Sequence, residues 1–140
     1  MDLLKLENQL CFPLYALSRQ ITNLYRPLLE NLDLTYPQYL VMLLLWENEL
    51  LSVKVIGEQL KLDSGTLTPL LKRLELRGLL TRARDPQDER VVKISITALG
   101  KKLKSKAADV PAQLSQQLPI EAEEGRLLIK QLRTILNSIS

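Results

Sequence analysis

The chemistry that this chain could carry centres on one thiol. Cys11 is the only cysteine among 140 residues, and there is no histidine. A thiol near the start of a helix reacts readily with peroxides, because the helix dipole favours its thiolate form. We therefore weigh a redox sensor and a thiol peroxidase against an inert buried cysteine, the commoner role of a lone cysteine. The absence of histidine and of a second cysteine disfavours the peroxidase, and it predicts no intrachain disulfide, metal site or cofactor.

Tyr15, Tyr25 and Tyr36 could supply phenol donors to that sulfur. Tyr15 follows Cys11 by four residues, so it lies on the same helical face. Tyr25 is also near that face, but the rise of a straight helix puts it about 21 Å away. An antiparallel meeting of two first helices would bring Tyr25 to the partner subunit's Cys11, with Tyr36 joining from the next helix. The alternative is that the tyrosines only pack at an interface.

A helix suited to DNA is predicted from Asp63 to Gly78. Leucines recur at helical spacing on one side, while hydroxyl groups lead and cations follow on the other. Short hydroxyl side chains can approach bases and phosphates closely, and a helix N-terminus favours an anionic oxygen. The candidate DNA contacts of this helix are Ser64, Gly65, Thr66, Thr68, Pro69, Lys72 and Arg73. The alternative is an ordinary amphipathic helix with a solvated polar face.

Neighbouring elements complete a winged helix-turn-helix. A short helix is expected at residues 54–60, and two strands at 79–84 and 91–96 enclose a turn-forming tip. This hairpin would be a wing, since an arginine at its end suits a narrow, electronegative minor groove. Its candidate DNA contacts are Arg84, Asp88 and Arg90.

The helix predicted from Asp63 to Gly78 would be the reading helix, the one that lies against the bases of DNA. Three residues could be its N-cap: Asp63, Ser64 and Thr66. Thr66 suits Pro69 best, because the donor that proline lacks would then fall among those unpaired in any first turn.

The remaining helices carry long apolar seams. We expect a first helix over about residues 7–32, capped by Asn8, and a second that starts at the capping box Thr35–Gln38. Thr97 should cap a helix interrupted at Pro111, before a last helix. Such seams exceed the usual exposed patch of a monomer, so we infer a homodimer whose reading helices lie roughly 34 Å apart over palindromic double-stranded DNA. The alternative is that the seams pack within one chain.

Positive charge is concentrated in the middle of the sequence. From Lys54 to Lys106 there are 13 basic and 6 acidic residues, whereas the two flanks together hold 6 and 10. A basic centre indicates a polyanionic partner. The longest apolar run, Tyr39–Trp46, is too short to span a membrane, and the first residues lack the pattern of a signal peptide. We therefore expect a cytoplasmic protein without a membrane partner.

These features resemble the MarR family of transcriptional regulators. Asp88-Glu89-Arg90, followed by Ile94–Thr97 and Gly100, is similar to the Asp-x-Arg hairpin signature of that family. Three further stretches resemble its peroxide-sensing branch, the organic hydroperoxide resistance regulators: Leu6–Phe12, Leu34–Tyr39 and Leu62–Pro69. The resemblance covers essentially the whole chain. It implies a mainly α fold with a small β wing, a winged helix-turn-helix with N- and C-terminal dimerisation helices.

The resemblance also implies a domain layout and a mechanism. Residues 1–140 would form a single domain, with the winged module at about 36–97 and dimerisation helices at about 1–34 and 98–140. Such proteins are homodimeric repressors, not enzymes, which leave their operator when an organic hydroperoxide oxidises the N-terminal cysteine. Tyrosine hydroxyls of the partner subunit hydrogen-bond the sulfur. The chain resembles the one-cysteine type, whose sulfenic acid goes on to a mixed disulfide with a small cellular thiol.

Two alternatives stay open within the family. The regulator could respond to a small phenolic ligand between its helices, with Cys11 incidental. Related staphylococcal global regulators share the Cys11 motif, so the targets could be stress or virulence genes. One position departs from the pattern, since Pro13 stands where an ordinary aliphatic residue is expected.

Overall fold

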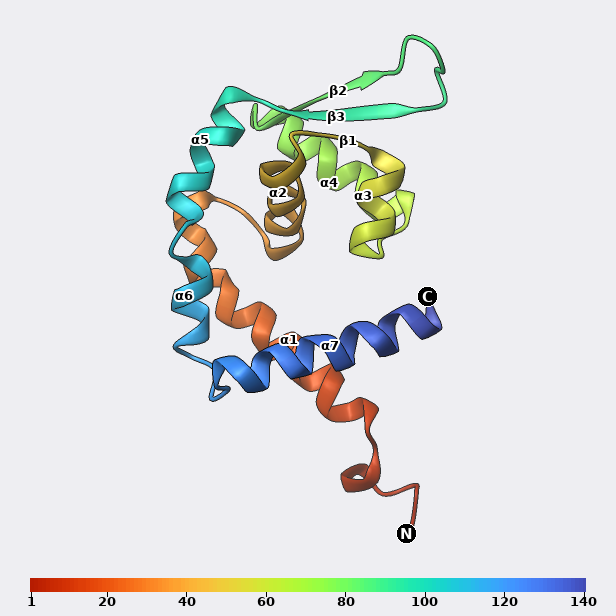
Figure 1. Ribbon diagram of the computed structural model, residues 1–140, viewed down its shortest axis with the longest axis vertical. Coiled ribbons are helices and arrows are strands. Elements are labelled where there is room, and N and C mark those ends of the chain that lie inside the picture. Colours follow the sequence, from red (N-terminus) through yellow and green to blue (C-terminus); the bar gives the residue numbers. More distant parts are fainter.

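The computed structural model describes all 140 residues and is mostly helical (Figure 1). In chain order the elements are η1 (Leu6–Asn8), α1 (Cys11–Leu29), η2 (Glu30–Leu32), α2 (Tyr36–Asn48), β1 (Leu50–Ser52), α3 (Val53–Leu60), α4 (Ser64–Leu76), β2 (Leu80–Arg84), β3 (Val92–Ile96), α5 (Ala98–Ala107), α6 (Val110–Ser115) and α7 (Ala122–Ile139). Helices α2, α3 and α4 lie together beneath the sheet, whereas α1, α6 and α7 extend away from it. The predicted mainly α fold with a small β wing is confirmed. None of the helices combines the length and apolar character needed to cross a membrane.

Three short antiparallel strands form the sheet, in the order β1-β3-β2. Ile94 in the central strand β3 lies opposite Leu51 of β1 on one side and Arg82 of β2 on the other. Its side chain is completely buried, as the alternating apolar pattern of this strand predicts. The two wing strands each begin one residue later than the sequence indicated. The sheet therefore anchors the base of the wing while its tip extends outward (Figure 1).

The apolar stripe of α4 fixes which side of that helix faces outward. Its four buried leucines are Leu67, Leu70, Leu71 and Leu74. They join a core with Ile56 of α3, Leu45 of α2 and Ile94 of β3. Burying one such side chain stabilises the fold by about 1.5–3 kcal/mol, so rotation of α4 about its axis would be costly. The hydroxyl and basic side chains are consequently held on the opposite, exposed face.

Helix capping agrees with the sequence at α2 and differs from it at α4. The Thr35 hydroxyl accepts from the backbone N–H of Gln38 at 3.3 Å, and the Gln38 side chain accepts from the Thr35 backbone at 3.0 Å. At α4 the preference for Thr66 was wrong, because the carboxylate of Asp63 accepts from the Thr66 backbone N–H at 2.7 Å. A carboxylate is both a good acceptor and favourable at the positive end of the helix dipole. Pro69 therefore lies inside the helix and removes one interior hydrogen bond.

The first long helix starts later than expected, at Cys11. Asn8 is not its cap, since this residue ends the 3-10 turn η1 and its side chain donates to the Asp2 carbonyl at 2.7 Å. Pro13 is then the third residue of α1, where no backbone N–H has an intrahelical partner. The departure at Pro13 is thus compatible with the helix, and Cys11 occupies its first position.

The C-terminal helices leave much apolar surface exposed. Thr97 caps α5 as predicted, accepting from the Gly100 backbone N–H at 3.0 Å. The break after α5 falls at residues 108–109, and Pro111 instead lies in the first turn of α6. Helix α7 buries none of its residues, and its apolar positions Leu128, Leu132 and Ile135 are 38%, 41% and 52% exposed. Its seam therefore does not pack within the chain, as the alternative interpretation required.

Candidate functional site

The outward face of α4 presents the hydroxyl groups that the sequence pointed to. Ser64, Gly65 and Thr66 are exposed in the first turn, and Thr68 is partly exposed one turn further. The pKa of Asp63 is lowered, mainly by the hydrogen bond from the Thr66 backbone, so the cap stays ionised at neutral pH. This carboxylate orders the first turn, and the Thr66 side chain also hydrogen-bonds to it.

The later part of the same helix carries exposed cations. Pro69, Lys72 and Arg73 are all exposed. Lys72 and Arg73 take part in none of the ion pairs of the chain. Unpaired cations following a hydroxyl-rich first turn form a surface that can contact phosphate oxygens and base edges.

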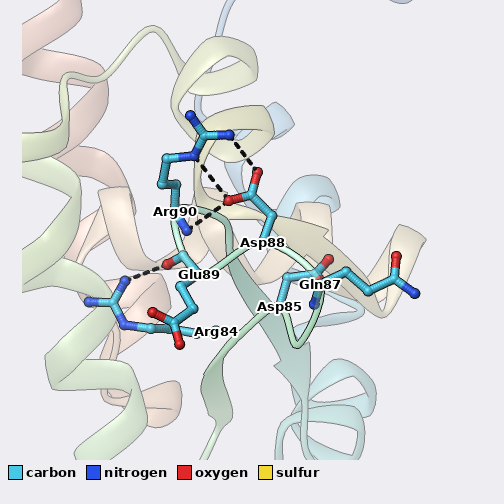
Figure 2. Close-up of polar contacts among 6 residues, drawn as sticks. All are labelled: Arg84, Asp85, Gln87, Asp88, Glu89 and Arg90. Atoms are coloured by element: carbon cyan, nitrogen blue, oxygen red, sulfur yellow. Dashed lines mark hydrogen bonds and ion pairs between the residues drawn. The ribbon is translucent and has the colours of Figure 1, made fainter.

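The tip of the wing holds an aspartate–arginine pair (Figure 2). The two oxygens of Asp88 accept from Nε and Nη2 of Arg90 at 3.0 and 3.2 Å, and Oδ1 also accepts from the Arg90 backbone N–H at 3.1 Å. These hydrogen bonds, the side-chain ones first, lower the pKa of Asp88. The Arg90 side chain is nevertheless 90% exposed. Asp88 therefore orients an arginine that remains available to a partner.

Arg84, a candidate DNA contact, also braces the loop of the wing. Its Nη1 donates to the backbone carbonyl of Glu89 at 2.7 Å, across the wing loop (Figure 2). A second contact supports the wing at its base, where the Glu75 carboxylate of α4 accepts from the backbone N–H and Nε of Arg82 at 3.0 and 3.2 Å. The loop and its angle to α4 are thus set by hydrogen bonds. Glu75 and Arg82 were missed because neither carries a signal beyond the general charge pattern.

A cluster of phenols joins α1 to α2. The ring centroid of Tyr25 lies 4.5 Å from that of Tyr36 and 5.7 Å from that of Tyr39. Burial, and then the neighbouring Tyr36 and Tyr39, raise the pKa of Tyr25 to about 12. Burial also raises the pKa of Tyr36 and of Tyr39. The hydroxyl groups accordingly stay protonated at neutral pH, so each can donate a hydrogen bond to an anionic acceptor.

The raised pKa of Tyr25 predicts a loss of stability in alkali. The folded protein keeps a proton that the unfolded chain releases between the ordinary value of 10.0 and about 12. The free energy of unfolding should therefore fall as the pH rises through this window. Urea unfolding of wild type and Tyr25→Phe from pH 7 to 12 would measure it. The difference between the proteins should be constant below pH 9 and shrink above pH 10; parallel curves throughout would contradict the assignment.

Cys11 lies at the other end of α1 from these phenols. It is the exposed first residue of the helix, and Tyr25 follows fourteen residues later. Tyr15 does not join the phenol cluster either, since its side chain is 62% exposed and the Arg19 guanidinium lies 5.5 Å from its ring centroid. Within one chain the structure thus joins Tyr25 with Tyr36 but does not bring either to the thiol.

Comparison with known proteins identifies the family. The family model described as "Transcriptional regulator SarA/Rot" matches residues 23–107. The chain is also 54% identical over 138 residues to the organic hydroperoxide resistance transcriptional regulator of Bacillus subtilis (strain 168), covering 99% of this chain and 94% of that protein. The chain belongs to the family of organic hydroperoxide resistance regulators. The resemblance inferred from its motifs is confirmed, and the protein is a transcriptional regulator, not an enzyme.

Solved structures agree with this membership. AbfR of Staphylococcus epidermidis, in a reduced form bound to DNA, is 36% identical with a TM-score of 0.80, covering 96% of this chain and 94% of that chain. An overoxidised form of AbfR bound to DNA is 37% identical with a TM-score of 0.78, covering 96% and 95%. PcaV of Streptomyces coelicolor, in complex with its natural ligand, is 25% identical with a TM-score of 0.87, covering 100% of both chains. The winged helix-turn-helix of the regulator family is therefore confirmed.

Besides Glu75 and Arg82, two further residues of this family member were not anticipated from its sequence. Tyr39 belongs to the phenol cluster, and its spacing of three from Tyr36 on one helix was the available signal. Arg77, at the end of α4, donates to the backbone carbonyls of Leu32 and Asp33 between α1 and α2. Since the two segments are far apart in the sequence, only the fold reveals this contact.

Proposed function

We propose that the protein is a homodimeric repressor that binds operator DNA and releases it when an organic hydroperoxide oxidises Cys11. One observation carries the proposal: an exposed thiol starts α1, whereas the protonated phenols suited to hold it lie near the other end of that helix. An antiparallel pair of α1 helices brings Tyr25 and Tyr36 to the partner subunit's Cys11. Tyr15, one turn after the thiol, is the third proposed donor.

Dimerisation is supported by the apolar surface of the flanking helices. The exposed fractions of Leu10, Leu14 and Leu17 on and beside α1 are 73%, 43% and 46%, and α7 buries no residue. Covering such seams with a second copy removes apolar surface from water and stabilises the pair. We assign dimerisation to about residues 1–34 and 98–140, and DNA binding to about residues 36–97, within one domain of 140 residues.

The DNA surface is proposed to combine α4 with the wing. The residues of α4 assigned to it are Ser64, Gly65, Thr66, Thr68, Pro69, Lys72 and Arg73. In the wing, Arg90 enters the minor groove, Asp88 orients it and Arg84 supports the loop. The two copies of α4 read a palindromic site, with the wings beside it. The cytoplasm is the proposed location, supported by DNA as the partner and by relatives that are transcriptional regulators.

The proposed chemistry is a two-electron oxidation of sulfur. The Cys11 thiolate attacks the terminal oxygen of the hydroperoxide, the S–O bond forms as the O–O bond breaks, and the sulfur keeps the hydroxyl group as a sulfenic acid. The departing alkoxide takes a proton from water and leaves as the alcohol. A small cellular thiol then attacks that sulfur; the S–S bond forms, the S–O bond breaks and water leaves. The bulky adduct displaces the phenols that held the thiolate. Arg77 ties the α1–α2 junction next to Tyr36 to the end of α4, so displacement there can change the spacing of the two reading helices.

Release of DNA by peroxide should depend entirely on the thiol. Titrating operator-bound wild type with cumene hydroperoxide in the presence of a small thiol should abolish binding in a gel-shift assay, and Cys11→Ser should stay bound, because serine retains the size of the side chain but cannot form a sulfenic acid. Equal release of both proteins would refute the proposal. Intact-mass spectrometry of the same samples should give an adduct in wild type only.

A second candidate is release by a small phenolic ligand. It is favoured by the similarity to PcaV, whose structure contains a natural ligand. In this case salicylate-like compounds should release the DNA from wild type and Cys11→Ser alike, whereas peroxide should release neither.

A further inference from the structure

A charged cavity of about 770 Å³ lies between the end of α1, the start of α2 and the later part of α4. Its volume is in the range of small-molecule sites. The charged side chains that line it are Arg26, Arg73, Arg77, Glu30 and Asp33. Tyr36 also lines it, so the cavity adjoins the phenol cluster.

The charges in this cavity do not cancel. The Arg77 guanidinium is already engaged within the chain, since its Nη2 donates to the Leu32 carbonyl at 3.0 Å and its Nε lies 3.7 Å from the Asp33 carboxylate. Arg26 and Arg73 form no ion pair with any residue of the chain. Two unpaired guanidinium groups therefore face one unpaired carboxylate, that of Glu30, which leaves the site suited to an anion. Arginine forms its best-defined contacts with carboxylates and phosphates.

We propose that this cavity receives the carboxylate of the small thiol that forms the mixed disulfide with the partner subunit's Cys11, and that Arg26 binds it. The inference rests on the proposed function, in which that sulfur lies against Tyr25 and Tyr36. Arg26 follows Tyr25 directly on α1, and Thr22, one turn earlier, also lines the cavity. A small thiol that is disulfide-bonded to the partner subunit's Cys11 beside the phenols would therefore lie next to this cavity. The sensor thereby prefers thiols that carry a carboxylate over neutral or cationic ones.

The test compares three thiols of similar size that differ in charge. Full-length wild type, oxidised by one equivalent of cumene hydroperoxide, is mixed with 3-mercaptopropionate, 2-mercaptoethanol or cysteamine, and adduct formation at Cys11 is followed by intact mass. Each rate is divided by that of Arg26→Gln, which cancels the intrinsic reactivity of each thiol. The ratio should be about tenfold for 3-mercaptopropionate, from loss of one charge-assisted hydrogen bond, and near or below one for cysteamine.

Two matched variants isolate the role of this side chain. Arg26→Lys should keep most of the preference because it keeps the charge. Arg133→Gln, which removes an exposed arginine of α7, should behave as wild type. Equal ratios for the three thiols would overturn the inference and leave the sensing mechanism intact, whereas no adduct with any thiol would overturn both. Equal ratios together with a loss of operator affinity in reduced Arg26→Gln would assign the cavity to a DNA phosphate instead.

Discussion

Replacing Gly100 with alanine is expected to destabilise the fold by about 3 kcal/mol, near the upper end for overpacking a core. A Cβ at this position would lie 2.3 Å from the backbone oxygen of Leu79 and 2.8 Å from Cγ1 of Ile96. The backbone oxygen cannot move without disturbing the start of β2. The Gly100 carbonyl also accepts from Nε1 of Trp46 at 2.8 Å, so a shift of α5 would break its connection to α2. Thermal unfolding should give a Tm lower by about 10 °C.

Gly125 offers the matched control for that experiment. It lies in α7, and a Cβ there would meet only Cγ2 of Ile120, at 3.8 Å. Gly125→Ala should be neutral or stabilise the protein by about 0.5–1 kcal/mol, because alanine is the better helix former. A Tm of Gly100→Ala within 2 °C of wild type would contradict the close packing of α5 against Leu79 and Ile96. The result also matters for function, since α5 connects the wing strands to the flanking helices.

The sequence predicted the fold well where burial repeats at a fixed period. The leucine stripe of α4 and the alternation around Ile94 arise from one-sided burial, and both appear in the structure as expected. The caps at Thr35 and Thr97 were also predicted, because a hydroxyl followed by its backbone partner is a local signal. Both kinds of signal, local capping chemistry and periodic burial, can be read from a single sequence.

Predictions were wrong where two local signals competed. Thr66 suits the cap position because Pro69 would then fall in the first turn, where its missing N–H costs nothing. The carboxylate of Asp63, a stronger acceptor, caps the helix instead, and Pro69 lies inside it. Asn8 resembled a cap, but its side chain instead satisfies the Asp2 carbonyl, and α1 starts three residues later. In both cases the free energies of the competing arrangements differ by about one hydrogen bond, which the sequence pattern does not resolve.

The candidate site also contains residues that the sequence predicts and contacts that only the fold reveals. The thiol and the phenols could be named from residue type and helical spacing, and the contact of Tyr25 with Tyr36 follows from the turn between α1 and α2. The contacts of Arg77 with the α1–α2 junction, and of Glu75 with Arg82, depend on pairs brought together only by folding. The residues that connect the thiol and phenols to α4 and the wing are therefore harder to predict from the sequence than the thiol, the phenols and the DNA-facing residues themselves.

Arg90→Ala should weaken operator binding about tenfold and reduce the slope of log affinity against log salt by about one unit for each wing. The side chain is 90% exposed at the wing tip, and its only ion pair is with Asp88, so it can neutralise a phosphate. Fluorescence anisotropy between 50 and 200 mM salt measures both quantities. Arg133→Ala, the same change of charge on α7, should leave the slope as in wild type. A weakened affinity with an unchanged slope would mean that Arg90 does not contact the DNA backbone.

Asp88→Asn separates orientation from charge at the same place. If only net charge mattered, removing a carboxylate beside DNA should strengthen binding, since one repulsive charge is lost. If Asp88 instead holds the Arg90 guanidinium with both its oxygens, the variant should bind more weakly, because an amide offers one acceptor where the carboxylate offers two. Weaker binding by Asp88→Asn, absent in the Arg90→Ala background, would demonstrate that the aspartate acts through the arginine. Stronger binding in both backgrounds would leave Asp88 as a mere negative charge.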